Sequence, residues 1–294
     1  MRVGAATRPA PTLVVSDATA TMTGSLYIVA TPIGNRDDIT ARAVQVLRKV
    51  AVIAAEDTRH SRPLLVHHGI DTALMTVHDH NERDAVEGVI ARLKAGDDVA
   101  LISDAGTPLV SDPGFRLVRA VRAEGLRVVP VPGPCAAIAA LSVAGLPSDR
   151  FVFEGFLAAK ASARRTRLQA LATETRTLIF YESGHRIVEA LTDMRDIFGP
   201  ARAAVLAREL TKVYETVIDE PLESLAARVA GDADQQKGEC VVLVAGAGDD
   251  ADARLAEGKR VFALLREELP ASRAAKLAAA ITGAPRKELY EAGD

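Results

Sequence analysis

Short apolar runs rich in β-branched residues alternate with longer segments of helical period along most of the chain. The runs that predict strands are LYIVA (26–30), VAVIAA (50–55), VALIS (99–103), LRVVPV (126–131), RTLIFYES (176–183), AAVLAREL (203–210), a β-forming segment at 213–219, and CVVLVAG (240–246). Helical patterns include 40–50 and 185–197. This alternation is typical of α/β architecture. We therefore predict an α/β fold with two domains, residues 25–112 and residues 113–248.

The predicted domain boundary falls in the loop that follows VALIS. Near the end of this loop, Asp112 suits a helix N-cap and Pro113 suits the first helical position. Gly125 suits the residue that ends such a helix. We therefore expect a helix over 113–124 to open the second domain.

The two ends of the chain differ from its middle. Residues 1–24 are rich in Thr, Ala and Pro, and we predict a disordered extension, with Met22 as an alternative start. Residues 249–294 begin with a polar linker and continue as short helical pieces broken at Pro270 and at Gly283–Pro285. Helices joined by a Gly-containing turn predict a small helix-turn-helix-like tail. The alternative is a packing or dimerisation appendage.

The composition fits a globular protein and limits its partners. Hydrophobic residues make up 48% of the chain, enough for a large core, and the net charge of −3 creates no global positive field. A nucleic acid would therefore meet a local basic patch. Cys135 and Cys240 lie far apart in sequence, as in a reduced cytosolic protein. Because no run of about 18 apolar residues occurs, we predict a soluble, cytoplasmic protein without a membrane segment.

Polar or Gly/Pro-rich loops, here called corners, follow several of the predicted strands. They are TPIGN, EDTR, SDAGTP, PGPCA, YESGH and ARELTK. Ligands of open α/β sheets bind beyond the carboxyl ends of the strands, so this series predicts a cleft. In SDAGTP, the amides of Ala105 to Thr107 can bind a ligand, Gly106 permits close approach, and Asp104 adds a carboxylate. The absence of Lys and Arg from this corner favours a ligand with an amine, a ribose and a base over a triphosphate. The alternative is a turn that only positions the next helix.

Three other segments carry residues with possible chemical roles. EDTRHS (56–61) places Glu56, Asp57, Arg59 and His60 after a buried strand, as either a solvated turn or a catalytic or substrate-binding group. PGPCA leads into a helix of small residues, which fits either a flat ligand or tight helix–sheet packing. HDHNER (78–83) lacks the partners of a structural zinc site, and we predict no metal.

A local basic patch is predicted from KASARRTR (160–167), which contains no acidic residue. Lys212, in ARELTKVYE, is a further cation of this kind. Such groups pair with phosphates. The predicted RNA contacts are Lys160, Arg164, Arg165, Arg167 and Lys212. The alternative is an ordinary solvated face.

Several segments, taken in their order and spacing, closely resemble the RsmI family of ribosomal RNA small subunit 2′-O-ribose methyltransferases. They are LYIVATPIGNRDDIT, AEDTRHSRPLL, HDHNE, LISDAGTPLVSDPG, VPVPGPCAAIAAL, FYESGHRI, ARELTKVYE and KGECVVLV. The resemblance implies the tetrapyrrole methylase fold, with S-adenosylmethionine in a cleft between two α/β domains, and a homodimer. It also implies methylation of a decoding-centre cytidine ribose in 16S rRNA (cytidine 1402 in ribosomal numbering), within the 30S subunit.

The same resemblance implies which residues contact S-adenosylmethionine. They are Pro32, Ile33, Asp104, Ala105, Gly106, Thr107, Cys135 and Ala136, followed by Tyr181, Glu182, Ala207, Arg208, Gly238 and Glu239. Many relatives carry Ser or Thr where this chain has Cys135. Because a thiol is a poor hydrogen-bond donor, we expect a backbone contact there.

Methylation of a 2′-hydroxyl requires alignment of the reactants and a path for the hydroxyl proton. We hypothesise that Glu56 or Asp57 accepts or relays this proton. Arg59, Arg208 or Lys212 would then hold a phosphate or the developing alkoxide. The alternatives are a tetrapyrrole C-methyltransferase of the same fold and a non-catalytic RNA-binding factor.

Overall fold

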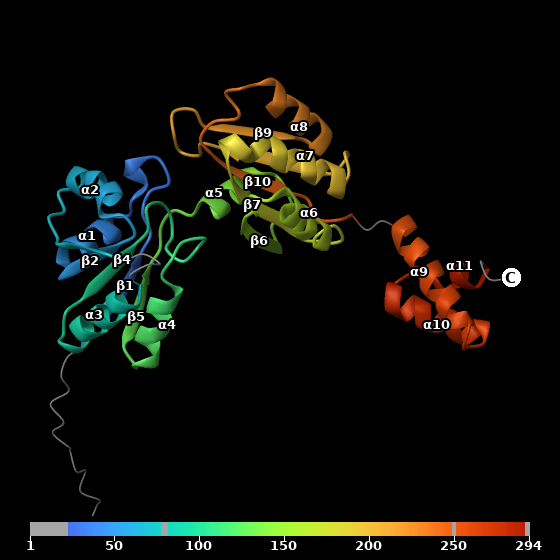
Figure 1. The fold of residues 1–294 in the computed structure, drawn as a ribbon, viewed down its shortest axis with the longest axis horizontal. Helices are drawn as coiled ribbons and strands as arrows, with labels where there is room; N and C mark the ends of the chain where they lie inside the picture. Colours follow the sequence, from blue (N-terminus) through green and yellow to red (C-terminus); the bar gives the residue numbers. More distant parts are fainter. Residues whose placement is uncertain (1–22, 78–81, 249–250, 292–294) are drawn as a thin grey trace, which may run out of the picture. The chain divides into compact units, whose positions relative to one another are not determined.

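The computed structural model describes residues 23–77, 82–248 and 251–291 (Figure 1). Most of the predicted N-terminal extension and the first four residues of HDHNER lie outside these ranges. The described chain divides into two compact units. Unit 1 contains the residues up to Thr31 together with Ile39–Gly133, and unit 2 contains Pro32–Asp38 and the chain from Pro134 onwards.

Unit 1 is built on a parallel sheet of five strands, in the order β3-β2-β4-β1-β5. Its elements are β1 (Ser25–Val29), α1 (Ala41–Lys49), β2 (Val52–Ala55), α2 (Thr58–His67), β3 (Leu74–Thr76), α3 (Glu82–Lys94), β4 (Val99–Ile102), α4 (Phe115–Ala123) and β5 (Arg127–Val131). Helices α1 and α2 pack on one face of the sheet, and α3 and α4 on the other. The central strands β2 and β4 are buried along their whole length, as expected for a sheet covered on both faces.

Unit 2 contains a mixed sheet in the order β6-β7-β10-β8-β9, in which only β6 and β7 run parallel. Its elements are η1 (Arg36–Asp38), α5 (Ala136–Val143), β6 (Phe151–Phe156), α6 (Ala161–Ala170), β7 (Thr177–Ser183), η2 (Gly184–Arg186), α7 (Ile187–Phe198), β8 (Ala203–Arg208), β9 (Thr216–Pro221), α8 (Leu222–Gly231) and β10 (Glu239–Val244). Helices α6, α7 and α8 cover one face of this sheet, and α5 covers the other.

The boundary between the units lies at Gly133 and Pro134, and not at the predicted junction of Asp112 and Pro113. Strand β5 pairs with β1 along its whole length, from Ser25 opposite Arg127 to Val29 opposite Val131. Helix α4 and β5 therefore complete the first sheet. The order of elements along the chain does not reveal which sheet a strand joins, because that depends on pairing between segments far apart in sequence.

Helix α4 begins at Phe115, two residues later than predicted. Gly114, with a φ of 120°, is its N-cap, and no side chain caps the helix. Asp112 instead is half-buried, and this burial raises its pKa. The predicted end of the helix is confirmed, since Gly125 follows it with a φ of 71°.

The tail is a group of three helices with its own apolar core. These helices are α9 (Ala251–Arg266), α10 (Ala271–Thr282) and α11 (Arg286–Glu291). As the sequence predicts, Pro270 precedes α10 and Gly283 ends it in a left-handed conformation. The segment predicted as a polar linker is helical from Ala251 onwards, so α9 is longer than expected.

Candidate functional site

The loop after β4 is joined to the loop after β1 by backbone hydrogen bonds. The amide of Thr31 donates to the carbonyl of Gly106 (2.8 Å), and the amide of Gly106 donates to the carbonyl of Thr31 (3.1 Å). Gly106 has a φ of 81°, where any other residue would be strained. Hydrogen bonds within unit 1 therefore hold the backbone of the predicted ligand corner, Asp104–Thr107, in place.

Asp57 meets Asp104 at the same edge of the sheet. The amide of Asp57 donates to Oδ1 of Asp104 (3.2 Å), which brings the catalytic candidates Glu56, Asp57 and Arg59 beside the ligand corner. Oδ1 of Asp57 accepts the amides of Arg59 (2.8 Å) and His60 (3.4 Å) as the N-cap of α2. These bonds, led by that from Arg59, lower the pKa of Asp57. Asp57 therefore caps α2, and its lowered pKa makes it a weaker base.

The chemistry of this edge suits a ligand with cationic or hydroxyl groups. Asp104 carries a carboxylate that forms no ion pair with a cation in the described part of unit 1. Ala105 has a small, exposed side chain, and the buried Gly106 has none. Ser103, just before the corner, is buried and directs its hydroxyl to the carbonyl of Ala105 (3.3 Å).

In unit 2, Tyr181 joins the start of α5 to the sheet. The hydroxyl of Tyr181 accepts the amide of Ala137 (3.0 Å), a first-turn amide that has no partner within the helix. Cys135 is the N-cap, but its thiol makes no capping bond. The rings of Phe153 and Phe156 pack edge-on against Tyr181, with centroids 4.9 and 5.5 Å away. The structure therefore brings Tyr181 to the predicted contacts Cys135 and Ala136.

The small residues of α5 are used in packing. Ala137, Ala140 and Ala144 are buried against Ile179 and Val241 of the sheet. Of the two interpretations of this helix, tight helix–sheet packing explains these positions.

Glu182 and Arg208 direct their side chains into the interior of unit 2. Oε1 of Glu182 accepts the amide of Ser183 (2.9 Å), and Oε2 lies 3.3 Å from Nη2 of Arg186. Arg208 donates to the side chains of Gln235 and Thr216 and to the carbonyls of Lys237 and Tyr214. Ala207, beside Arg208 on β8, is also buried. A ligand contact at these three positions would therefore use the backbone.

The start of β10 is joined to the loop after β8. The amide of Glu209 donates to the carbonyl of Glu239 (2.9 Å), and the amide of Glu239 donates to Oε1 of Glu209 (3.0 Å). Nζ of Lys212 bonds both carboxylates, at 2.7 Å to Glu209 and 2.8 Å to Glu239. Gly238, with a φ of 79°, lies so close to Glu209 that a side chain would collide with it. Lys212 is thus occupied by two acidic partners.

The segment that contains Pro32 and Ile33 reaches this same loop. The amide of Asn35 donates to Oγ1 of Thr211 (3.0 Å), and a Cβ on Gly34 would lie only 2.5 Å from Cγ of Lys212. One edge of unit 2 therefore gathers this segment with Gly238, Glu239 and Lys212.

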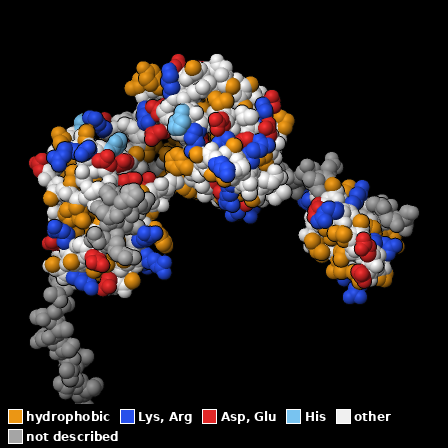
Figure 2. Space-filling view, in the orientation of Figure 1, with side chains coloured by type: hydrophobic (Ala, Val, Ile, Leu, Met, Phe, Trp, Pro, Cys, Tyr) orange, Lys and Arg blue, Asp and Glu red, His pale blue; other side chains and the backbone are white. Residues whose placement is uncertain are grey.

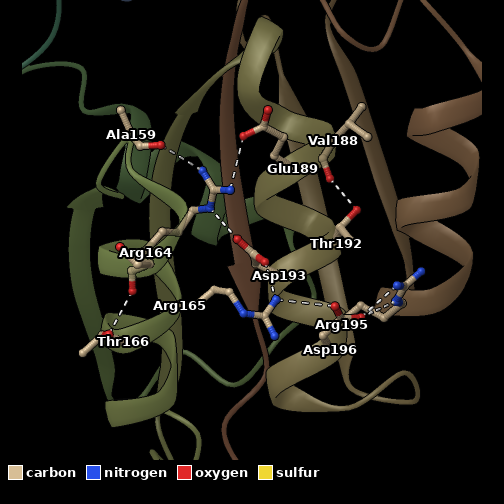
Figure 3. A network of polar contacts seen from close by, with 11 residues as sticks. Ala159, Arg164, Arg165, Thr166, Val188, Glu189, Thr192, Asp193, Arg195 and Asp196 are labelled. Atoms are coloured by element: carbon tan, nitrogen blue, oxygen red, sulfur yellow. Dashed lines mark hydrogen bonds and ion pairs between the residues drawn. The ribbon is translucent and has the colours of Figure 1, made fainter.

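Helix α6 contains the predicted basic patch, but its central arginine is buried (Figure 3). Only 3% of the Arg164 side chain is exposed. Its Nε donates to Oδ2 of Asp193 (2.6 Å), and its Nη2 donates to Oε2 of Glu189 (3.2 Å). The predicted RNA contact at Arg164 is wrong for this reason, because its guanidinium is held in the interior.

The neighbouring arginines are exposed but paired. Nη1 of Arg165 donates to Oδ1 of Asp193 (2.5 Å), and Arg167 forms two bonds to Glu154 (2.7 and 2.8 Å). These acids hold the pKa of both arginines above its ordinary value. Lys160, the N-cap of α6, is exposed and makes no side-chain capping bond.

Sequence reasoning missed Thr31 and the acids that face α6. Thr31 belongs to the corner TPIGN, but its pairing with Gly106 depends on the fold. A signal for the acids does exist, because Glu189, Asp193 and Asp196 recur at intervals of four and three residues, which places them on one side of a helix. Such a stripe can pair with a basic helix packed beside it.

The described ranges contain neither a metal cluster nor a membrane-spanning helix. Within them, no group of three or more His, Cys, Asp and Glu side chains could hold a metal ion. No helix of those ranges is long and apolar enough to cross a membrane.

Comparison with known proteins defines the class first. The family model of tetrapyrrole (corrin/porphyrin) methylases matches residues 25–226, and that of the RsmI C-terminal HTH domain matches residues 252–293. Cobalt precorrin-4 methyltransferase shares the fold, with a TM-score of 0.57, 16% identity, and coverage of 75% of this chain and 94% of that one. So does a Thermus thermophilus uroporphyrin-III C-methyltransferase complexed with S-adenosyl homocysteine (TM-score 0.52, 18% identity, 76% and 97% coverage). The chain is a methyltransferase with the tetrapyrrole methylase fold.

Closer relatives then identify the family. Proteins named ribosomal RNA small subunit methyltransferase I from Xylella fastidiosa (strain Temecula1) and Pseudomonas aeruginosa are each 62% identical to this chain, over 91% of its length and 98% and 96% of theirs. The protein of that name from Escherichia coli O157:H7 is 53% identical, over 91% of this chain and 94% of its own. The chain belongs to this family of ribosomal RNA small subunit methyltransferases, the RsmI family.

Proposed function

We propose that the protein transfers a methyl group from S-adenosylmethionine to the ribose 2′-hydroxyl of a decoding-centre cytidine in 16S rRNA, cytidine 1402, within the 30S subunit. Membership of the family supports methylation of small-subunit rRNA, and the motifs of the sequence support the 2′-hydroxyl as its target. The proposal includes a homodimer that acts in the cytoplasm, where ribosomes are assembled.

The residues at the edge of unit 1 fit S-adenosylmethionine, which supplies the methyl group. The observation that carries the proposal is the corner held by the Thr31–Gly106 bonds, with the Asp104 carboxylate beside it. A carboxylate can accept ribose hydroxyl protons or pair with the amino group of this ligand. The corner contains no Lys or Arg that would repel a cation. Ala105, Gly106 and Thr107 complete the unit 1 contacts.

The remaining contacts of the proposal lie on unit 2. Pro32, Ile33, Cys135 and Ala136 would act through backbone groups and small or apolar side chains, with Tyr181 fixing the start of α5. For Glu182, Ala207 and Arg208 the contact is proposed through the backbone, because these side chains are buried. Gly238 and Glu239 complete the set.

We propose different roles for the two adjacent carboxylates. Glu56 follows β2 directly and is half-buried, and we assign it as the group that accepts or relays the hydroxyl proton. Asp57 holds the start of α2 and the position of Asp104, which makes it a positioning residue. Arg59, one residue after the start of α2, would hold a phosphate or the developing alkoxide.

The function is tested by incubating the protein with labelled S-adenosylmethionine and 30S subunits, or naked 16S rRNA, from a strain that lacks this modification. We expect label on the ribose of one cytidine, located by alkaline hydrolysis, to which 2′-O-methylated linkages are resistant. Label on base atoms, or none with either RNA, would refute the proposal. The Asp104→Ala variant should lose the rise in melting temperature that the ligand causes in the parent protein.

Single variants test the division of roles. Glu56→Gln should lower kcat about a hundredfold or more, the range expected for loss of a general base, and still be stabilised by S-adenosylmethionine. Asp57→Asn should retain most of the turnover, because Asn caps a helix nearly as well as Asp. Full turnover in Glu56→Gln would exclude Glu56 as the base.

A further inference from the structure

Helices α1 and α2 carry five cationic side chains and no acidic one. These are Arg42, Arg48 and Lys49 of α1, and Arg59 and Arg62 of α2. All five are exposed. Among the residues that the structure describes, none of the five forms an ion pair with a carboxylate. We call this set the α1–α2 surface.

The two helices form one continuous face of unit 1. Both pack on the same side of the sheet, in a shared core that includes Leu47 and Leu65. Nη2 of Arg48 donates to the carbonyl of His68 (2.5 Å), and the hydroxyl of Thr72 donates to the carbonyl of Leu47 (2.6 Å), so the end of α1 is joined to the end of α2. Figure 2 shows Lys, Arg and His side chains gathered where Figure 1 places these helices.

Two other helical regions neutralise several of their cations, although Arg119 and Arg122 of α4 form no ion pair in the described chain. On the opposite face of the same sheet, Lys94 pairs with Glu124 and Arg92 pairs with Asp97. On α6, the arginines pair with acids of α7 and β6. Unpaired like charges repel one another, so the α1–α2 surface is complementary to an anion that lies outside this chain.

The position of the surface identifies that anion. In parallel α/β units each helix starts at the carboxyl edge of the sheet, so Arg42, Arg59 and Arg62 lie at the edge where Asp57 meets Asp104. A chain of phosphates that passes this edge would place one nucleotide beside Glu56. Arginine forms two parallel hydrogen bonds with phosphate, and polynucleotide affinity rests largely on such contacts.

We propose that the α1–α2 surface binds the RNA backbone on either side of the nucleotide to be methylated. The inference rests on the proposed function for its substrate and adds where that substrate is held. The contacts are to phosphates and carry no base specificity, so the surface sets affinity and register, whereas the edge with Glu56 and Asp104 performs the reaction.

The experiment compares two triple variants of the full chain that lose equal charge. The surface variant carries Arg42→Gln, Arg48→Gln and Lys49→Gln, which leaves Arg59 intact. The matched control carries Arg119→Gln, Arg122→Gln and Arg127→Gln, three exposed cations of α4 and β5 in the same unit. Binding to an unmodified 16S rRNA transcript is measured across a salt series, and methyl transfer to 30S subunits is measured in parallel.

We expect the surface variant to reduce the slope of log affinity against log salt by about 2, because each phosphate contact contributes about 0.7 for single strands. Affinity at about 0.1 M salt should then fall roughly a hundredfold, and the two variants should converge towards 1 M. The control should keep the parent slope. Both should still be stabilised by S-adenosylmethionine. If the triple surface variant does not fold, Arg42→Glu alone should lower the slope by about 1.

An unchanged slope in the surface variant, or an equal loss in the control, overturns the inference. So does an unchanged slope accompanied by a change of oligomeric state, which would assign the surface to a protein partner. Failure of the proposed function has a different signature, since the parent protein would then bind the transcript without methylating a cytidine ribose in either RNA.

Discussion

Helix α6 and the α1–α2 surface are both rich in arginine, yet they use it in opposite ways. On α6, Arg164 is buried and Arg165 and Arg167 are paired with carboxylates. On α1 and α2, the cations remain in solvent without acidic partners in the described chain. The difference arises from the neighbours, because α7 presents an acidic stripe to α6 (Figure 3), whereas α1 and α2 pack on an apolar sheet. A cluster of cationic residues in a sequence therefore indicates a binding surface only when the folded structure leaves those side chains without carboxylate partners.

The largest effect on stability is expected from loss of the buried ion pair between Arg164 and Asp193. Arg164→Ala should lower the free energy of unfolding by about 3–5 kcal/mol, because it leaves the Asp193 carboxylate without its buried partner. Arg42→Ala, the matched exposed arginine, should change it by no more than about 0.5 kcal/mol. Urea denaturation of both variants measures this. Similar small losses in both would show that α6 is no more structural than α1.

Lys212 is an intermediate case, a predicted RNA contact that has acidic partners. Lys212→Met should reduce stability by about 1–2 kcal/mol through the loss of its bonds to Glu209 and Glu239. The salt dependence of RNA binding should stay at the parent value, since a paired cation releases few counterions. Thermal denaturation and a salt titration give the two quantities, and a reduced salt slope would move Lys212 into the RNA-binding group.

Single arginines provide the direct comparison of the two regions. Arg62→Gln should lower the salt slope of rRNA binding by about 0.7–0.9, which is roughly a five- to eightfold loss of affinity at 0.1 M salt. Arg167→Gln should leave the slope unchanged, because Glu154 already neutralises that side chain. Fluorescence anisotropy with a labelled 16S rRNA fragment measures both. The reverse order of effects would contradict the assignment of the two regions.

The smallest expected effect is a change in the stability of the protein at acidic pH. Hydrogen bonds from Arg195, and secondarily from Arg165, hold the pKa of Asp196 below its ordinary value of 3.8. A lowered folded pKa stabilises the protein above the ordinary value, and that contribution disappears as the pH falls. The small difference in melting temperature between the parent and Asp196→Asn should therefore be present at neutral pH and shrink below about pH 4. An Arg62→Gln variant has no carboxylate partner to lose and should show no such trend.

Much of the fold could be predicted from local pattern. The predicted strands at 26–30, 50–55, 99–103 and 126–131 match β1, β2, β4 and β5 within two residues at each end. Short or irregular strands were missed. Strand β3 has only three residues, and β6 has a register shift between Phe153 and Gly155, so neither displays a clear period. The β-forming Val213 and Tyr214 lie in an exposed loop before β9, because the hydrogen bonds of Arg208 and Lys212 shape that loop.

The candidate site was predicted as a set of corners, and the structure assigned each corner its role. Glu56, Asp57 and Asp104 were singled out in sequence, but it is the fold that joins Asp104 to the Glu56–Asp57 segment, through the bond from the Asp57 amide. The N-cap geometry of Asp57 then distinguishes it from Glu56, which composition and spacing could not do. In the same way, Glu182 and Arg208 carry the expected residue types but direct their side chains inward.

The sequence by itself determined the α/β class, the corners at the strand ends, and the family. Each of these depends on residues close together in the chain, whose periods and turns can be recognised without knowing their neighbours. The tertiary structure decided that β5 completes the first sheet, that Arg164 is buried, and that the cations of α1 and α2 remain unpaired. These properties depend on which segments become neighbours in space. A charged side chain is available to a ligand only if folding places no opposite charge beside it.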